Sequence, residues 1–272
     1  MSHGGAGAGR AKERKEPQGP LENLLSSQEL SVLRGVASSA RLKEDLALAF
    51  LARRDLPPLV LEDVSRNGTA MRHRKVILAV VQHPRTPRHV TLPITRHLYT
   101  FELMQLALLP TFATDLKLAV EEILIGRLDT ISSGERMSLA RRGSTRIAAA
   151  LLTDPETRVI EAALDNPHLT EIWVVKNLMR EDAPHSFVHA AGSHEKWSLR
   201  RDVQVALLRN QHTPLARAIA IAAALPVQVV RDVLHHSHLQ PNIKAYLADQ
   251  LVRREQKKTA RVANPGPVEH SE

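Results

Sequence analysis

The stretch ALLRNQHTPLARAIAIAAAL, residues 206–225, contains the pattern that decides the fold. An apolar helix end is followed by Arg209 and Asn210, by a short turn, and then by Thr213 and Pro214. A threonine at the N-cap followed by proline at the first helical position marks the start of a helix. Proline has no backbone N–H, and the N–H of the first helical residue would have no partner within the helix. The stretch therefore predicts the end of one helix, a tight turn and the beginning of the next helix.

The same arrangement recurs along the chain. It is found in VVQHPRTPRHVTLPITRHL (80–98), AALDNPHLTEIWVVKNL (162–178) and DVLHHSHLQPNIKAYLADQL (232–251). Most neighbouring turns are roughly 25 residues apart, which is typical of repeats that bury their apolar faces only by stacking. The pattern predicts an all-α fold, an α-solenoid of HEAT-like superhelical repeats of short helices. The alternative is an irregular helical domain whose helices share the same kind of cap.

The composition narrows the kind of core and the kind of chemistry. The chain of 272 residues is 43% hydrophobic, but it has only 4 Phe, 2 Tyr and 2 Trp, and no Cys. The core must therefore be aliphatic. The absence of sulfur ligands excludes a disulfide scaffold, a thiolate zinc site, an iron–sulfur cluster and a cysteine nucleophile.

Composition also predicts where the repeats begin and end. Residues 1–20 are rich in glycine and alternating charge, and residues 253–272 open with a basic cluster, so we expect disordered tails at both ends. Residues 21–252 are expected to form a single α-helical repeat domain. No apolar run approaches the ~18 residues of a membrane helix, and the N-terminus has no apolar signal segment. We therefore expect a cytoplasmic protein with no membrane partner.

The positive charge is concentrated in one part of the sequence. The whole chain carries +8, and residues 51–99 alone hold nine basic and three acidic residues. Such a surface could contact the phosphates of a nucleic acid. The candidate polyanion-binding residues are Arg72, Arg74, Lys75, Arg85, Arg88 and Arg96. The alternative is a solvated face, and few aromatics are present here to stack on bases.

Two other groups of residues could form a specific site, one for a metal ion and one for a nucleic-acid base. His235, His236 and His238 with Asp232 form the densest histidine cluster, but histidines are also typical of a helix C-terminus, and we favour that interpretation over a metal site. Trp173 and Trp197, with acidic Asp165, could surround an extruded base as in a DNA glycosylase. We favour packing roles for both tryptophans.

No catalytic pattern is present in the sequence. GGAGAGR at residues 4–10 lacks the third glycine of a dinucleotide loop, and there is no nucleophile elbow and no zinc-protease helix. Glu121 and Glu122 are adjacent and would diverge by about 100° around a helix, so they cannot flank one bond. We predict no enzyme activity, no catalytic residue and no cofactor.

The turns LDNPHLTE and LRNQHTP resemble those of leucine-rich repeat variant and HEAT-like proteins of bacteria. The resemblance extends over about residues 45–252 and concerns only helix and turn patterns. Some leucine-rich repeat variant proteins carry a cysteine cluster for iron and sulfur, and this chain has no cysteine to form one. The repeated caps and helices, together with the lack of a catalytic pattern, favour a non-enzymatic binding or scaffold module that presents its helical surface to a protein partner. Nucleic-acid binding through the basic region is the alternative, and a HEAT-like DNA glycosylase is a further one.

Overall fold

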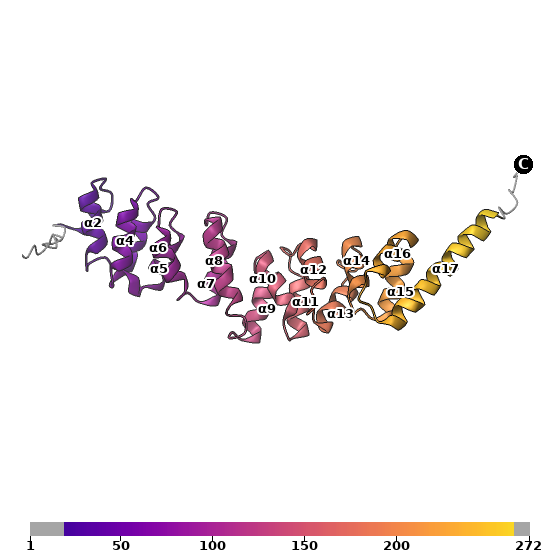
Figure 1. Ribbon diagram of the computed structural model, residues 1–272. Helices are drawn as coiled ribbons and strands as arrows, with labels where there is room; N and C mark the ends of the chain where they lie inside the picture. The colour runs from indigo at the N-terminus through magenta and orange to yellow at the C-terminus, as the bar shows by residue number, and fades with distance from the viewer. Residues whose placement is uncertain (1–18, 264–272) are drawn as a thin grey trace, which may run out of the picture. The chain divides into compact units, whose positions relative to one another are not determined.

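The computed structural model describes the backbone of residues 19–263 and the side chains as far as Gln256. Within that range the chain forms helices and no strand, so the prediction of an all-α protein is confirmed (Figure 1). Two compact units are present, unit 1 (Met1–Ile123) and unit 2 (Leu124–Glu272). None of the described helices is both long and apolar enough to span a membrane.

Unit 1 is built from short helices that pack against the next helix but one. Helix α2 packs on α4 and α3 packs on α5, while α5 also contacts α4 and α6. The last helix, α8, ends just beyond the unit boundary. The bounds are α1 (Leu21–Leu24), α2 (Leu30–Ser38), α3 (Glu44–Leu51), α4 (Pro58–Arg66), the 3-10 turn η1 (Ala70–Arg72), α5 (Arg74–Gln82), α6 (Arg88–Thr95), α7 (Thr100–Leu108) and α8 (Thr114–Ile125).

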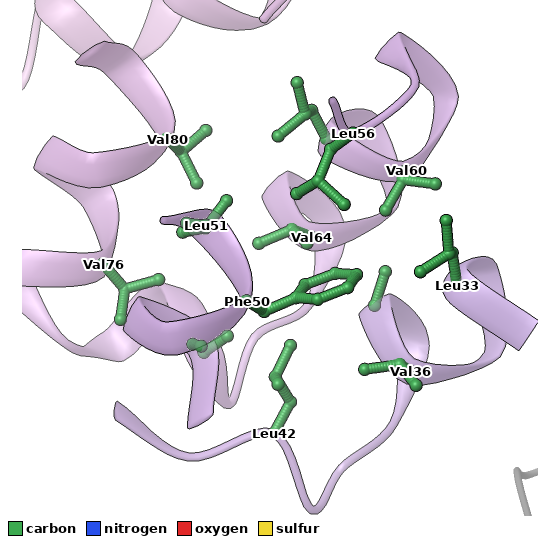
Figure 2. Close-up of a cluster of buried hydrophobic side chains, with 14 of the residues drawn as sticks. Leu33, Val36, Leu42, Phe50, Leu51, Leu56, Val60, Val64, Val76 and Val80 are labelled. Carbon is green, nitrogen blue, oxygen red and sulfur yellow. The ribbon is translucent and has the colours of Figure 1, made fainter. Parts of the chain in front are cut away.

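The core of unit 1 is aliphatic and centres on one aromatic ring. Phe50 of α3 is fully buried, and Figure 2 shows its ring between α2 and α4, close to Val36, Leu42 and Val64. The other buried side chains of this cluster are Leu, Val and Ala, as the scarcity of aromatic residues predicts.

Unit 2 uses the same kind of packing. Helices α9, α11 and α13 contact one another in succession, as do α10, α12, α14 and α16, and α17 packs on α15 and α16. The bounds are α9 (Ser133–Arg142), α10 (Thr145–Ala150), the 3-10 turn η2 (Leu151–Thr153), α11 (Thr157–Leu164), α12 (Glu171–Leu178), α13 (His185–Ser193), α14 (Arg201–Arg209), α15 (Leu215–Ala224), α16 (Val227–His235) and α17 (Pro241–Ala263).

The helix starts lie one residue later than the sequence pattern predicts. Pro214 is the N-cap of α15 rather than its first residue, and Pro87 is the N-cap of α6. The hydroxyl of Thr213 donates to the carbonyl of Leu207 at 2.6 Å, at the end of the preceding helix. That carbonyl also accepts from the backbone N–H of Asn210 at 3.0 Å, so the threonine hydroxyl adds a second hydrogen bond at the end of one helix, and the proline precedes the next helix.

The two expected tails fall mostly outside the described residues. Of the N-terminal segment 1–20, only residues 19 and 20 are described. At the other end α17 continues to Ala263, so residues 253–263 are helical where a disordered tail was expected. Arg254 explains part of this, because it donates to the carbonyl of Ala222 at 2.6 Å. Residues 264–272 lie outside the described range.

Unit 2 repeats the helix pattern of unit 1 at a distance of 127 residues. Helices α3, α4, α5 and α7 have the same lengths as α12, α13, α14 and α16, and each begins 127 positions before its counterpart. The turns agree as well: Arg53 forms an ion pair with Asp55, and Arg180 forms one with Asp182. The pattern of helices α2 to α8 is thus followed by a second copy of the pattern, α11 to α17.

Candidate functional site

The six basic residues singled out from the sequence all lie in unit 1. Arg74 and Lys75 open α5, and Arg88 opens α6. Arg72 ends the 3-10 turn, Arg85 lies in the turn after α5, and Arg96 is the C-cap of α6. Arg74 is half-buried and the other five are exposed. The structure therefore keeps them at the surface, where they are accessible to solvent or to a partner.

Several of these cations are paired with carboxylates. Lys75 lies 3.6 Å from Glu44, and Arg88 lies 2.8 Å from Asp115. Arg74 forms a two-point hydrogen bond with Glu102, in which its Nε lies 2.7 Å from Oε1. Glu44, Glu102 and Asp115 lie outside residues 51–99, so the charge counted in that window overstates the positive charge of the folded surface.

The Arg74 site has the most specific geometry in this group. The guanidinium lies 4.0 Å from the centre of the Tyr99 ring, and the backbone N–H of Tyr99 donates to Glu102 at 2.8 Å. The hydrogen bonds from Arg74 lower the pKa of the Glu102 carboxyl, against the opposing effect of its partial burial. Glu102 thus fixes the first turn of α7 to the first turn of α5, which is a structural role for Arg74.

Arg85 is bound to the backbone instead of to a carboxylate side chain. Its Nη1 donates to the carbonyl of Asp55 at 2.7 Å. Arg72 and Arg54 form no hydrogen bond or ion pair with any described residue. Since the candidate cations do not form one group that is open to phosphates, the basic surface is a weak basis for a polyanion site.

A surface pocket of about 260 Å³ lies between the ends of α3 and α5. Its apolar wall includes Leu48 of α3, Ala52 directly after α3 and Ala79 of α5, and Arg54 and Gln82 lie at its polar side. Leu48 and Ala79 are half-buried, while Ala52 and Gln82 are exposed. The remaining lining residues are Leu51, His83, Pro84 and Thr111. We call this the α3–α5 pocket.

Buried polar contacts hold the α3–α5 pocket in shape. His83 is buried in the turn after α5, and its Nε2 lies 2.7 Å from the carbonyl oxygen of Arg53. The hydroxyl of Thr86 donates to the backbone carbonyl of Val80 at 2.6 Å, so the turn after α5 supplies a hydrogen bond to the last turn of that helix. These contacts fix the two helix ends that line the pocket. The histidine thus joins the turn after α5 to the backbone just after α3.

The other candidates have structural partners. Helix α16 ends at His235, and the Nδ1 of the C-cap His236 lies 3.1 Å from the carbonyl of Asp232. No group of three or more metal-ligating side chains is found within the described range. Trp197 is buried and donates its Nε1 proton to Leu164 at 2.7 Å, so it cannot stack on an extruded base. Trp173 is half-buried with Lys176 over its ring, and Asp165 is exposed beside His194.

The chain was compared with known proteins, and no protein-family model, no curated protein and no solved structure matches it.

The α3–α5 pocket was not predicted from the sequence. Its lining comes from three separate segments, and its apolar members are ordinary helix residues. The one signal was the turn motif RRDLP (53–57), which returns as REDAP (180–184).

Proposed function

We propose that the protein is a non-enzymatic binding module, in which each unit is a HEAT-like segment of α-solenoid and the α3–α5 pocket receives a protein partner. The observation that carries this proposal is the pocket itself, an apolar surface with a polar edge between the ends of two packed helices. Interfaces combine an apolar centre with a polar rim in this way. The stacking of helices within each unit supports the HEAT-like assignment.

The pocket suits an apolar side chain of a partner better than a phosphate group. Half-buried Leu48 and Ala79 and exposed Ala52 would gain from losing water contact, at roughly 25 cal/mol per Å². Arg54, at the polar side, has no partner among the described residues and could pair with an acidic residue or a carbonyl at the rim. A phosphate-binding role would need more than one unpaired cation at this place.

Affinity purification with two matched variants tests the proposal. Ala52 and Ala49 are both exposed on or just after α3, but only Ala52 lines the pocket. We expect Ala52→Glu to lose partners that the unchanged protein and Ala49→Glu both retain in quantitative mass spectrometry. Equal recovery of every protein by the three forms would contradict the proposal, as would no protein enriched over a bead control.

A further inference from the structure

A second surface pocket, of about 370 Å³, lies in unit 2 between the ends of α12 and α14. It occupies the place of the α3–α5 pocket in the 127-residue repeat. Arg209 stands where unit 1 has Gln82, and Asn210 stands where it has His83. Glu181 replaces Arg54, and His238 replaces Thr111. A pocket thus lies at the corresponding place in both copies of the repeat, and the second pocket is lined by residues of different charge.

Arg209 is the unusual member of this second pocket. Its Nε is buried and has no hydrogen-bond partner. Its guanidinium forms no hydrogen bond or ion pair with any described residue, although Glu181 lines the same pocket. A buried donor without a partner costs about 1–3 kcal/mol, and more when the group is charged. The pocket therefore contains a cationic donor that has no partner among the described residues.

The other guanidinium of the pocket is already occupied. Arg180 binds both oxygens of Asp182, with Nε to Oδ1 and Nη2 to Oδ2 each 2.8 Å. Asn210 is also occupied. Its side-chain amide donates to the backbone carbonyl of Leu178, and its side-chain oxygen accepts from the backbone N–H of His212. A ligand entering the pocket would find Arg209 as its charged donor.

The lining indicates which anion fits. A guanidinium presents a planar fork that matches the two oxygens of a carboxylate or phosphate. Glu181 adds a negative charge to the same pocket, which opposes a doubly charged phosphate more than a singly charged carboxylate. Leu178 and the exposed Met179 supply an apolar wall for methylene groups.

We propose that the α12–α14 pocket binds one carboxylate at the end of a short aliphatic chain, with Arg209 as its anchor. The carboxylate can be a glutamate side chain of a peptide or a free small acid, and both present the same chemistry to the guanidinium. This site goes beyond the proposed function, since it requires neither the α3–α5 pocket nor the partner that would bind there.

The buried Nε–H of Arg209 provides a direct test by NMR on the full chain labelled with ¹⁵N. The probes are glutamate blocked at both ends, glutamine blocked in the same way, free butyrate and inorganic phosphate, at matched ionic strength. We expect blocked glutamate or butyrate to shift the Arg209 signal saturably, and blocked glutamine to leave it unchanged. Tighter binding of blocked glutamate indicates a peptide source, and tighter binding of butyrate a free acid.

Three variants followed by ligand-observed NMR complete the test. Arg209→Gln, which installs the residue of the first pocket, should weaken binding at least about tenfold. Glu181→Gln should strengthen it about two- to tenfold, and the exposed Arg158→Gln in the same unit should change nothing. No saturable shift, an equal shift with blocked glutamine, preference for phosphate, or unchanged binding in Arg209→Gln would each overturn the proposal.

Discussion

The side-chain amide of Asn166 donates a hydrogen bond of 2.7 Å to the backbone carbonyl of Ala140, across two stacked helices of unit 2. Asn67 makes the equivalent contact in unit 1, with its amide 2.8 Å from the carbonyl of Ala37. Each asparagine follows one helix and satisfies a carbonyl at the end of the helix stacked on it. The turns of this fold therefore hold neighbouring layers together as well as connecting them.

We expect Asn166→Ala to destabilise the protein by about 1–3 kcal/mol, because it leaves buried backbone groups without partners. The amide also donates to Gly143, and the side-chain oxygen accepts from the N–H of His168. Urea unfolding followed by circular dichroism measures the change. Asn242→Ala, at an exposed position, is the control and should change stability by less than about 0.5 kcal/mol. Equal effects of the two substitutions would disprove this role of Asn166.

Two glycines near the ends of α9 should respond to alanine in opposite directions. A Cβ at Gly143 would lie 2.5 Å from the carbonyl oxygen of Leu139 and 2.9 Å from a methyl group of Ile147, whereas a Cβ at Gly134 meets no atom within 4 Å. We expect Gly143→Ala to destabilise by about 1–3 kcal/mol through overpacking. Gly134→Ala should stabilise by up to about 1 kcal/mol, since alanine favours the helix. Thermal unfolding of both variants checks the two signs.

The Arg74 and Glu102 pair should make stability depend on pH. Because Arg74 lowers the pKa of Glu102 in the folded state, the pair stabilises the fold above the unfolded pKa of about 4.3, and this contribution is lost as the pH falls through the lower, folded pKa. We expect Arg74→Gln to cost up to about 1 kcal/mol at pH 7, with the difference from the unchanged protein shrinking below about pH 4.

Chemical unfolding between pH 2.5 and 7 measures this difference. Arg72→Gln is the matched control, since Arg72 lies two residues away and pairs with no carboxylate among the described side chains. A constant difference between Arg74→Gln and the unchanged protein over the whole range would show that the ion pair makes no pH-dependent contribution.

The acidic partners of the basic surface provide a further prediction. Glu44 and Glu102 neutralise Lys75 and Arg74, so substituting both by Gln should release two cations and raise the affinity for duplex DNA severalfold at about 50 mM salt. The control changes Glu22 and Asp45, exposed acids of the same unit, to Gln and Asn. Fluorescence anisotropy compares them. Equal affinity of the two double variants would show that the pairing does not limit DNA binding.

Much of the fold could be predicted from local chemistry, because the helix ends are marked by Pro, Thr and Asn. The role of Thr213 could not, since a hydroxyl can cap the helix after it or complete the helix before it, and only the distance to Leu207 decides. The net charge of residues 51–99 overstated the positive charge of the folded surface for a related reason. Folding brings Glu44 and Glu102 from outside that range onto Lys75 and Arg74.

The two pockets could not be predicted from the sequence, because few residues are identical between the two copies of the 127-residue repeat. Phe50 of the first copy corresponds to Asn177 of the second, and Gln82 corresponds to Arg209. The helix lengths and the stacking are preserved while the lining side chains differ. Apart from the turn motif RRDLP that returns as REDAP, the correspondence rests on the two sets of helix bounds.

The central claim is that the α3–α5 pocket receives a protein partner, and site-specific photo-crosslinking tests it most directly. A photoreactive amino acid would replace Gln82, which lines the pocket, or Leu92, which is exposed elsewhere in the same unit. We expect a discrete protein adduct from position 82, lost with Ala52→Glu and retained with Ala49→Glu, and none from position 92. Adducts of equal yield from both positions, or none from position 82, would contradict the claim.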